Sequence, residues 1–535
     1  MAIAVNQLIL IIVAGVLAAR AGRRLRIPES IPLLITGYIL GGDLLGVWKP
    51  NLLGIDLGFL SIIAIPVILY YGGLKTDAKN IASKWRTILS VTTIAVFITV
   101  IGIATLSYYL LNLPLNLSLL LGAILSSTDA AAILPVIRNL NINKKVSTLI
   151  SAEAVLNDAT AITLFTSLFG LASGSEISLK IAISQFLYYL IASSAVGILV
   201  GIVANEVFKK LKISGELTFA SLIVMLTAYG LAQAISVSSV IAVVLSALVF
   251  RYFLQSGQVD PLERLNTLSA WESLSFLALA IIFLVLGGEL RIATILPYLL
   301  AGTLISFLFI LIVRPLSVIA SMWFDKSYNL KEMLFISFAG SPRGAVSAAL
   351  ASVVLVESAG AGLSNIQATT IFSVTIIVIL ITIAIASLFA STVAKYLLGA
   401  SENSVESRYR LLSTQLKSMN IASRRMREDW KIGLIPSITY DEISKEYSKQ
   451  MESIELELTS LTTKSPYLKS RERAIHIKEL LMNQIASLDQ SYENKEISQD
   501  DYEELSRQFR SQIQTLTDLE DKDTQIIQQR NEKQN

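Results

Sequence analysis

Three carboxylates lie in two neighbouring apolar stretches of the chain. Asp129 follows Ser126-Ser127-Thr128, while Glu153 and Asp158 lie five positions apart in the next stretch. On insertion scales a carboxylate at the centre of a membrane helix costs at least ~2.5–3.5 kcal/mol, so a chain that keeps one there usually has a function for it. Three such acids close together predict a protein that moves protons or cations.

Asp158 is the candidate binding residue for both kinds of ion. On a helix, Glu153 and Asn157 share a face, whereas Asp158 is rotated by about 100° from Asn157. A dehydrated sodium ion needs several oxygen ligands. The carboxylates of Asp158 and Asp129, the Thr128 hydroxyl and carbonyls freed by an unwound helix are candidates, with Asn157 beside them. A proton and a cation then compete for one site, and this competition couples their movements.

Glu153 has two candidate partners, Arg314 near the end of one apolar run and Arg343 within another. Because charges inside membranes usually pair, we favour a structural ion pair for Glu153. The same kind of pairing is the alternative interpretation of Asp158, for which we favour a function. For Asp129 the two interpretations are close.

The composition identifies a membrane protein. Of 535 residues, 53% are hydrophobic and 16% charged, and the mean hydropathy is +0.61. A soluble protein is unable to bury that much apolar surface, so we expect an all-α polytopic membrane protein. The apolar runs end near Leu398, and the remainder is polar and highly charged. We therefore predict a transmembrane domain at 1–398 and a cytoplasmic helical domain at 399–535.

Cysteine and histidine usage excludes several kinds of chemistry. The chain has no cysteine, which excludes disulfides, thiolate metal sites and cysteine nucleophiles. Its single histidine, His476, lies in the polar tail, so carboxylates must carry any protons within the apolar region. The tail has no Gly-rich nucleotide motif and no cluster of metal ligands, and we predict no cofactor.

Windows of ~20 largely apolar residues, the length that a helix needs to cross a bilayer, occur about thirteen times. The first is not a cleavable signal peptide, because its arginines follow the apolar stretch. Lysine and arginine gather in alternate loops, which by the positive-inside rule puts the N-terminus outside and the C-terminal domain in the cytoplasm. The expected spans are 3–20, 30–47, 57–74, 87–111, 116–138, 147–171, 179–205, 216–234, 237–254, 269–288, 293–313, 333–356 and 367–394.

Two of these spans are interrupted at their centres. The fifth contains Ser126-Ser127-Thr128-Asp129, and the twelfth contains Gly340-Ser341-Pro342-Arg343-Gly344, where proline removes a backbone donor and glycine weakens the helix. Asp129 and Arg343 are 214 positions apart, and the first and eighth spans begin about 213 apart. This spacing predicts two inverted six-helix repeats with discontinuous helices 5 and 12, an arrangement typical of a transporter site at mid-membrane. The alternative is a proline kink in a packed helix.

Four short motifs resemble those of one family. Glu153-Ala-Val-Leu-Asn157-Asp158-Ala-Thr-Ala is similar to the Glu-Ser-x-x-Asn-Asp-Ala/Thr signature of NhaP/NHE-type monovalent cation:proton antiporters. Thr128-Asp129, Arg343-Gly-Ala-Val-Ser and Trp271-Glu272 resemble that family's Thr-Asp-Pro, Gly-Leu-Arg-Gly-Ala-Val-Ser and Phe/Trp-Glu elements. The resemblance covers roughly residues 1–398, in the family's order of motifs. Glu272 lies near the inner mouth of the tenth expected span, where it is placed to attract cations, although most such residues are solvated boundary charges.

The resemblance implies thirteen helices in inverted repeats, a homodimer, and an elevator-like movement of the domain that carries the fifth, sixth and twelfth helices. It assigns ion binding to Asp158, the acid of the unwound helix to Asp129, and a structural role to Glu153, paired with Arg314. Asn157 stands where electrogenic relatives have a second aspartate. The resemblance therefore implies electroneutral exchange of one cation for one proton.

Three positions depart from the family pattern. Ala154 replaces a serine and so removes a hydroxyl, Ala130 replaces the proline after Asp129, and Tyr70-Tyr71-Gly72-Gly73 stands where many members have Phe-Glu-Gly-Gly. These changes keep the antiport chemistry but weaken the case for sodium over potassium or lithium.

The polar tail contains an internal duplication. Residues 435–447 parallel residues 497–509 at an offset of 62, and Tyr440, Ile443 and Tyr447 have the spacing of an amphipathic helix. We expect two helical hairpins followed by a disordered, glutamine-rich end. The domain either forms a dimer contact, regulates the membrane domain, or is a passive appendage.

These observations predict a secondary antiporter of the cell membrane that exchanges Na⁺, or Li⁺ or K⁺, for H⁺ and serves pH homeostasis. Its partners are these ions, the lipid bilayer and a second copy of the chain, with no nucleic acid. A cation channel is the second hypothesis, but inverted interrupted helices suit alternating access better. An intramembrane aspartyl protease is the enzyme alternative, and its Tyr-Asp and Gly-x-Gly-Asp motifs are absent. A purely structural scaffold would not explain charges that are costly to bury in a membrane.

Overall fold

The computed structural model describes most of the chain. The described residues form two compact units, Met1–Ala400 and Ser401–Asn535. They are residues 2–25, 27–47, 57–76, 84–129, 133, 142–172, 179–211, 216–255, 259, 261–357, 363–399, 405–431, 436–464, 481, 484–485, 487–488, 498–499, 502, 504–509 and 511.

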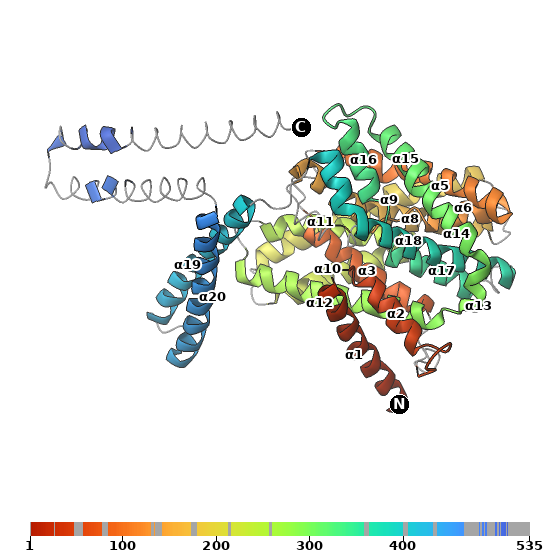
Figure 1. The fold of residues 1–535 in the computed structure, drawn as a ribbon, viewed down its shortest axis with the longest axis horizontal. Coiled ribbons are helices and arrows are strands. Elements are labelled where there is room, and N and C mark those ends of the chain that lie inside the picture. The colour runs from red at the N-terminus through yellow and green to blue at the C-terminus, as the bar shows by residue number, and fades with distance from the viewer. Residues whose placement is uncertain are drawn as a thin grey trace. The chain divides into compact units, whose positions relative to one another are not determined.

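The first unit is built from helices that pack side by side (Figure 1), and no strand occurs among the described residues. The prediction of an all-helical fold is therefore confirmed. The helices are α1 (Ala2–Leu25), α2 (Ser30–Leu40), α3 (Leu57–Lys75), α5 (Trp85–Leu111), α6 (Leu115–Ile124), α8 (Lys144–Ala172), α9 (Leu179–Leu211), α10 (Leu217–Ala234), α11 (Ser239–Gln255), α12 (Pro261–Glu289), α13 (Ile292–Ile295), η3 (Leu296–Tyr298), α14 (Leu299–Leu308), η4 (Phe309–Val313), α15 (Arg314–Met322), α16 (Leu330–Ala339), α17 (Ala345–Glu357) and α18 (Asn365–Leu398).

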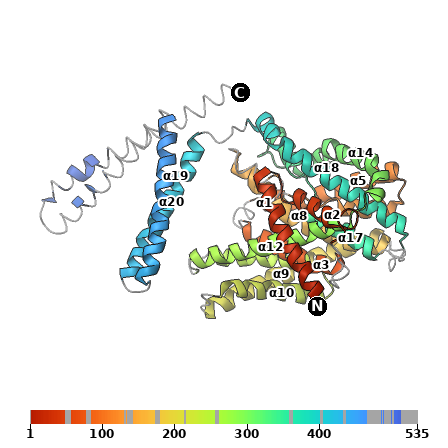
Figure 2. The same ribbon diagram turned by 60° about the horizontal axis from the view of Figure 1, so that its bottom comes forward.

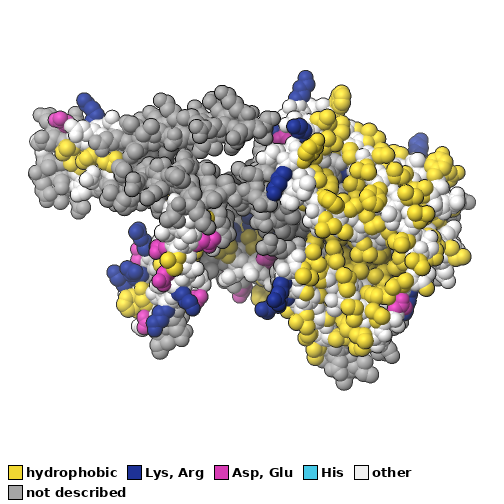
Figure 3. Space-filling model, viewed as in Figure 1, with side chains coloured by type: hydrophobic (Ala, Val, Ile, Leu, Met, Phe, Trp, Pro, Cys, Tyr) yellow, Lys and Arg dark blue, Asp and Glu magenta, His cyan; other side chains and the backbone are white. Residues whose placement is uncertain are grey.

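Many outer residues of this unit are apolar, as expected for a surface that faces lipid. Phe219, Leu300 and Ile366 are each more than 70% exposed, and Figure 3 shows a broad apolar face with lysine and arginine side chains mainly at its margins. Seven helices of the described residues are long and apolar enough to cross a membrane. Each of the thirteen expected spans overlaps a helix or a series of helices, and the count of thirteen crossings stays a prediction.

The second expected span, 30–47, is shorter in the structure than we expected. Helix α2 ends at Leu40 after 11 residues, which is about 16 Å of helix against a hydrocarbon core of ~30 Å. Gly41 follows with an extended ψ of −179°, and Gly46 has a φ of +62° that reverses the chain. A Cβ at Gly41 would lie 2.8 Å from the Gly288 Cα of α12. The glycines that end α2 therefore also permit close packing against α12.

The helices of the unit form two groups of contacts. In one, α12 packs against α2 and α3 (Figure 2), and α11 packs against α9, α10 and α3. In the other, α5 packs against α6, α8 and α15, while α16 and α17 both pack against α18. Helices α8 and α17 also contact α3, which joins the two groups. The second group contains the two interrupted spans.

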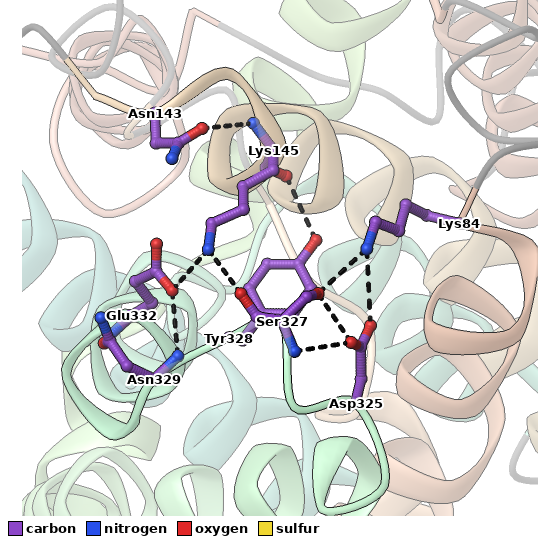
Figure 4. Close-up of polar contacts among 8 residues, drawn as sticks. All are labelled: Lys84, Asn143, Lys145, Asp325, Ser327, Tyr328, Asn329 and Glu332. Carbon is purple, nitrogen blue, oxygen red and sulfur yellow. Dashed lines mark hydrogen bonds and ion pairs between the residues drawn. The ribbon is translucent and has the colours of Figure 1, made fainter.

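A polar network fastens the start of α8 to the start of α16 (Figure 4). The Lys145 ammonium donates to Glu332 Oε2 at 2.9 Å and to the Ser327 carbonyl at 2.6 Å. Asn329 and Glu332 form a capping box, in which each side chain accepts from the other residue's backbone amide. The Lys145 ammonium also lies 5.0 Å from the centre of the Tyr328 ring.

The same network reaches the start of α5. The Lys84 ammonium donates to Ser327 Oγ at 2.9 Å and lies 4.0 Å from Asp325 Oδ2, while the Thr87 hydroxyl also donates to Asp325. Burial, together with the charges of Asp325 and Glu332, raises the pKa of Tyr328 to about 12, so its hydroxyl stays protonated. These contacts hold the starts of α5, α8 and α16 as one piece.

The second unit contains a helical hairpin. Helices α19 (Val405–Lys431) and α20 (Ser437–Lys464) lie side by side in Figures 1 and 2. Trp430 and Tyr440 stack at 4.7 Å where the two helices join, and Tyr409, Leu412 and Leu458 form a small buried cluster. The first copy of the expected duplication falls mainly on α20. Of the second copy, residues 497, 500, 501 and 503 lie outside the described residues, as does the glutamine-rich end after residue 511.

Candidate functional site

The non-helical stretches that follow α6 and α16 meet inside the first unit. Helix α6 ends at Ile124 and α16 ends at Ala339, and the chain is not helical at 125–129 and 340–344, which we call the interrupted segments. The backbone amide of Asp129 donates to the Pro342 carbonyl at 2.8 Å. The Ser347 hydroxyl, from the first turn of α17, donates to the Ile124 carbonyl at 2.7 Å. The Pro342 carbonyl and the last carbonyl of α6 thus each have a hydrogen-bond partner from the other span.

Arg343 stabilises the second interruption from within. Its side chain is fully buried, and Nη1 donates to the carbonyls of Gly340 at 2.9 Å and Pro342 at 3.3 Å. The guanidinium lies 4.3 Å from the centre of the Phe309 ring, and the Arg343 amide donates to Thr382 Oγ1 of α18 at 3.2 Å. A cation beside the last carbonyls of α16 complements the negative end of that helix dipole.

Asp129 lies at the start of α17. The Gly344 carbonyl accepts the first hydrogen bond of α17, from Ala348, so Gly344 occupies the N-cap position. A Cβ at Gly344 would fall on the Asp129 carboxylate. The absence of that Cβ lets the acid approach the helix N-terminus, where amide donors and the helix dipole favour a negative charge.

Helix α8 presents Asp158 and Asn157 to the first interrupted segment. The Ser127 hydroxyl donates to Asp158 Oδ1 at 2.6 Å, and the Thr128 backbone amide also bonds this carboxylate. Asn157 Nδ2 donates to Thr128 Oγ1 at 3.3 Å. Ser127, Thr128 and Asn157 are each at most 3% exposed, whereas Asp158 and Asp129 are partly exposed. The two aspartates are therefore the accessible acids of an otherwise buried polar cluster.

Glu153 and Arg314 form a separate buried pair. Both side chains are 1% exposed, and Arg314 Nη2 donates to Glu153 Oε1. A Cβ at Gly340 would fall on the Arg314 guanidinium and lie 3.2 Å from Glu153 Oε2. The glycine that ends α16 therefore leaves room for the ion pair beside the interruption.

Arg314 follows a π-helical turn, η4, which spans Phe309–Val313. Pro315 follows Arg314 and lacks a backbone N–H, so a regular α-helical hydrogen bond is missing there. Such π-turns inside helices are common at functional positions. Here the turn also includes Phe309, on which the Arg343 guanidinium lies.

Several buried polar atoms of the site have no hydrogen-bond partner among the described residues. The acceptors are Glu153 Oε2 and Asn157 Oδ1, and the donors are on the two arginines. Because an unsatisfied buried acceptor costs roughly 1–3 kcal/mol, each one needs an explanation. The two acceptors lie one turn apart on the same face of α8, beside the interrupted segments.

The structure thus brings most of the expected site residues together. Thr128 and Asp129 come from one interrupted segment, and Asn157 and Asp158 come from α8. Arg343 donates to carbonyls of its own segment, while Arg314 bonds Glu153. Glu272 is exposed on α12, which belongs to the other group of helices.

Sequence reasoning missed other contributors to the site. Ser127 and Ser347 lie inside the quoted motifs, but nothing in their spacing indicated that they bond Asp158 and Ile124. Phe309 and Thr382 come from distant helices and carry no sequence signal.

Comparison with known proteins identifies the family of this fold. A sequence model described as the transmembrane sodium/hydrogen exchanger matches residues 8–396. The chain belongs to the sodium/hydrogen exchanger family. The resemblance predicted from the motifs is therefore confirmed, and this exchanger-family chain is a multi-pass membrane protein of a family of transporters.

Two curated relatives illustrate the range of this family. The Na(+)/H(+) antiporter NhaH of Halobacillus dabanensis is 28% identical over 376 residues, which cover 66% of this chain and 90% of that protein. The K(+)/H(+) antiporter NhaP2 of Shewanella sp. (strain ANA-3) is 27% identical over 350 residues, covering 64% of this chain and 59% of that protein.

A solved structure supports the same assignment. The sodium proton antiporter MjNhaP1 from Methanocaldococcus jannaschii at pH 8 matches with a TM-score of 0.65 and 25% identity, covering 74% of this chain and 99% of that chain. The exchanger-family chain is therefore one of the NhaP-type cation:proton antiporters.

Proposed function

We propose that this protein exchanges a monovalent cation for a proton, with both ions competing for Asp158. The observation that carries the proposal is the position of Asp158, which faces a non-helical segment and accepts from the Ser127 hydroxyl at 2.6 Å. Around it lie the oxygens of Thr128 and Asn157, and Asn157 Oδ1 has no partner among the described residues. A carboxylate with several neutral oxygens nearby suits a dehydrated monovalent cation. A bound proton removes the charge that holds that cation.

The net charge of the site supports one-for-one, electroneutral exchange. Arg314 balances Glu153 directly. Arg343 and Asp129 carry opposite charges at the two interrupted segments, where each complements a helix end. Asp158 is then the one carboxylate of these three whose negative charge is not matched by an arginine. With either a proton or a monovalent cation bound to it, the site has the same net charge, so a membrane potential does not favour either loaded form.

Alternating access follows from the architecture that we propose. Thirteen spans form two inverted halves, and the interrupted segments occupy corresponding places, 214 positions apart. We place the N-terminus outside and residues 399–535 in the cytoplasm, and we expect a homodimer in the bilayer. The network of Figure 4 supports joint movement of two of the site helices, because it joins the start of α8 to the start of α16, and both to the start of α5.

Sodium is the cation that we propose, with lithium and potassium as alternatives. NhaH and MjNhaP1 are named for sodium, while NhaP2 is named for potassium. Glu272, exposed on α12, is proposed to attract cations toward the site rather than to bind them in it.

The test is cation-driven dissipation of a pH gradient in vesicles that contain the purified protein. We expect exchange with sodium, and the same rate with the membrane potential clamped at zero or imposed. Asp158→Asn should abolish exchange, because amide nitrogen replaces an anionic oxygen. Glu206→Gln is the matched control, since Glu206 forms only an exposed pair with Lys209, worth at most ~1 kcal/mol.

Three outcomes would contradict the proposal. Exchange that persists in Asp158→Asn would contradict the site assignment. A rate that depends on the imposed potential would contradict electroneutrality. Cation flux without proton movement would favour the channel hypothesis.

A further inference from the structure

The Ser127 hydroxyl is one of the buried hydroxyls of this protein that bond a carboxylate rather than a backbone carbonyl; that of Thr87 is another. Buried threonines within the helices, such as Thr163 and Thr375, donate to the carbonyl one turn back, at 2.8 and 2.7 Å. Ser127 lies in a non-helical segment, is 1% exposed, and donates to the carboxylate of Asp158 at 2.6 Å. In this non-helical segment the Ser127 hydroxyl bonds an acid on another helix. In a regular helix the same hydroxyl would bond the backbone of its own helix.

We propose that the Ser127 hydroxyl is a ligand of the transported cation and sets how well that cation competes with the proton. This inference rests on the proposed function of Asp158. A hydroxyl has one hydrogen to donate and two lone pairs. Ser127 therefore donates its hydrogen to Asp158 Oδ1 and still offers a lone pair to a cation held by the same carboxylate.

The donated hydrogen bond also favours one of the two competing ions. A hydrogen bond to an ionised acceptor is roughly twice as strong as one between neutral groups. Ser127 therefore stabilises the ionised carboxylate, which binds the cation, more than the protonated carboxyl. Removal of the hydroxyl weakens cation binding in two ways: one oxygen ligand is lost, and the Asp158 carboxylate is protonated more easily.

The adjacent residue provides a matched control. Ser126 is also 1% exposed and lies in the same interrupted segment, but its hydroxyl donates to the Ala123 carbonyl at 2.8 Å. Ser126→Ala therefore removes the same atom from the same segment without touching Asp158. Ser127→Thr keeps a hydroxyl at the position and tests rescue.

The experiment measures exchange in vesicles with lithium, sodium and potassium over a range of pH. We expect Ser127→Ala to raise the apparent KM for sodium about tenfold, equivalent to about 1.4 kcal/mol of binding, and to leave the maximal rate within about twofold. The acid limit of activity should move to higher pH. The KM change should differ among the three cations, because a lost ligand affects ions of different size unequally. Ser126→Ala should match the wild type, and Ser127→Thr should stay within about threefold of it.

Specific results would overturn this assignment. An apparent KM and pH profile of Ser127→Ala that match those of Ser126→Ala would remove any role for the hydroxyl. A fall in maximal rate at unchanged KM would show a positioning role instead. An equal KM change for all three cations would exclude ligation. If wild-type protein exchanges ions and Asp158→Asn does not, these results count against Ser127 alone. Absence of exchange in the wild type would instead refute the proposed function.

Discussion

The buried pair of Glu153 and Arg314 should be replaceable by apolar side chains together but not singly. The single variants are Glu153→Leu and Arg314→Met, and the third variant combines them. Both native side chains are 1% exposed, so each single variant leaves an uncompensated charge away from solvent. Removal of one partner of such a pair typically costs ~3–5 kcal/mol, whereas well-packed apolar replacement of both is often neutral or stabilising.

The structure also orders the two single variants. The fully buried Arg343 guanidinium interacts electrostatically with both Glu153 and Arg314. Loss of Glu153 leaves two neighbouring cations, while loss of Arg314 leaves Glu153 facing Arg343. We therefore expect Glu153→Leu to be the more destabilising, near the upper end of ~3–5 kcal/mol, and Arg314→Met to be near the lower end.

The assay is unfolding of the purified protein in mixed micelles by a denaturing detergent, followed by tryptophan fluorescence. The four proteins form a double-mutant cycle, and we expect a coupling energy above roughly 3 kcal/mol, beyond the range seen for most neighbouring residues. The exposed pair Glu206 and Lys209 provides the control cycle, for which ~0.2–1 kcal/mol is expected.

The reasoning would be refuted by a coupling energy no larger than that of the exposed pair. A second readout separates stability from transport. If the pair is structural, the double variant exchanges ions at close to the wild-type rate. A stable double variant without exchange would give Glu153 a part in transport.

Two further predictions concern other close contacts. Gly344→Ala should lower the exchange rate at least about tenfold (~1.4 kcal/mol), because the new Cβ displaces the Asp129 carboxylate from the start of α17. Gly230→Ala, where a Cβ meets nothing within 4 Å, is the control, and equal rates in both variants would contradict the contact. Hydrogen bonds from Arg291 and then from the Ile292 amide hold the pKa of Asp43 below its usual 3.8, so its stabilising effect is present above pH 3.8 and is lost as the pH falls through the lowered pKa. Asp43→Asn should therefore melt below the wild type at neutral pH and converge with it in acid. A deficit that does not shrink as the pH falls below 3.8 would argue against this linkage.

The family, the helical class and the interruption at 340–344 were predictable from local sequence. Proline and glycine signal a helix break wherever they occur, and acids within apolar runs are rare enough to mark a site. Asp129 lies just after α6, and Asn157 and Asp158 lie on α8. These two helices are neighbours in sequence, so the proximity of the segment after α6 to this part of α8 was predictable. Their role as the ion site stays a prediction.

Contacts between distant segments were not predictable. The residues alone offered Glu153 both Arg314 and Arg343, and only the family resemblance pointed to Arg314, the partner that the structure shows. Which guanidinium reaches Glu153 depends on where the π-turn before Pro315 and the turn at Gly340 place each one. The shortness of α2 was also missed, because hydropathy continues past Gly41 while the backbone turns. Ser127 lacked a signal because the direction of its hydroxyl depends on a break whose local geometry no residue pattern specifies.

The groups that bond Asp158 are neutral, and this has a consequence for the leakage of ions without exchange. Its hydrogen-bond donors are a hydroxyl and a backbone amide, neither of which cancels the charge of a bare carboxylate. In the proposed exchanger, a carrier that has released its ion therefore has an uncompensated charge to move through the membrane. A cost of ~2.5–3.5 kcal/mol for such a charge would slow the empty return roughly 100-fold. The acid proposed to bind the ions would thereby suppress slippage, with no gate or lock required.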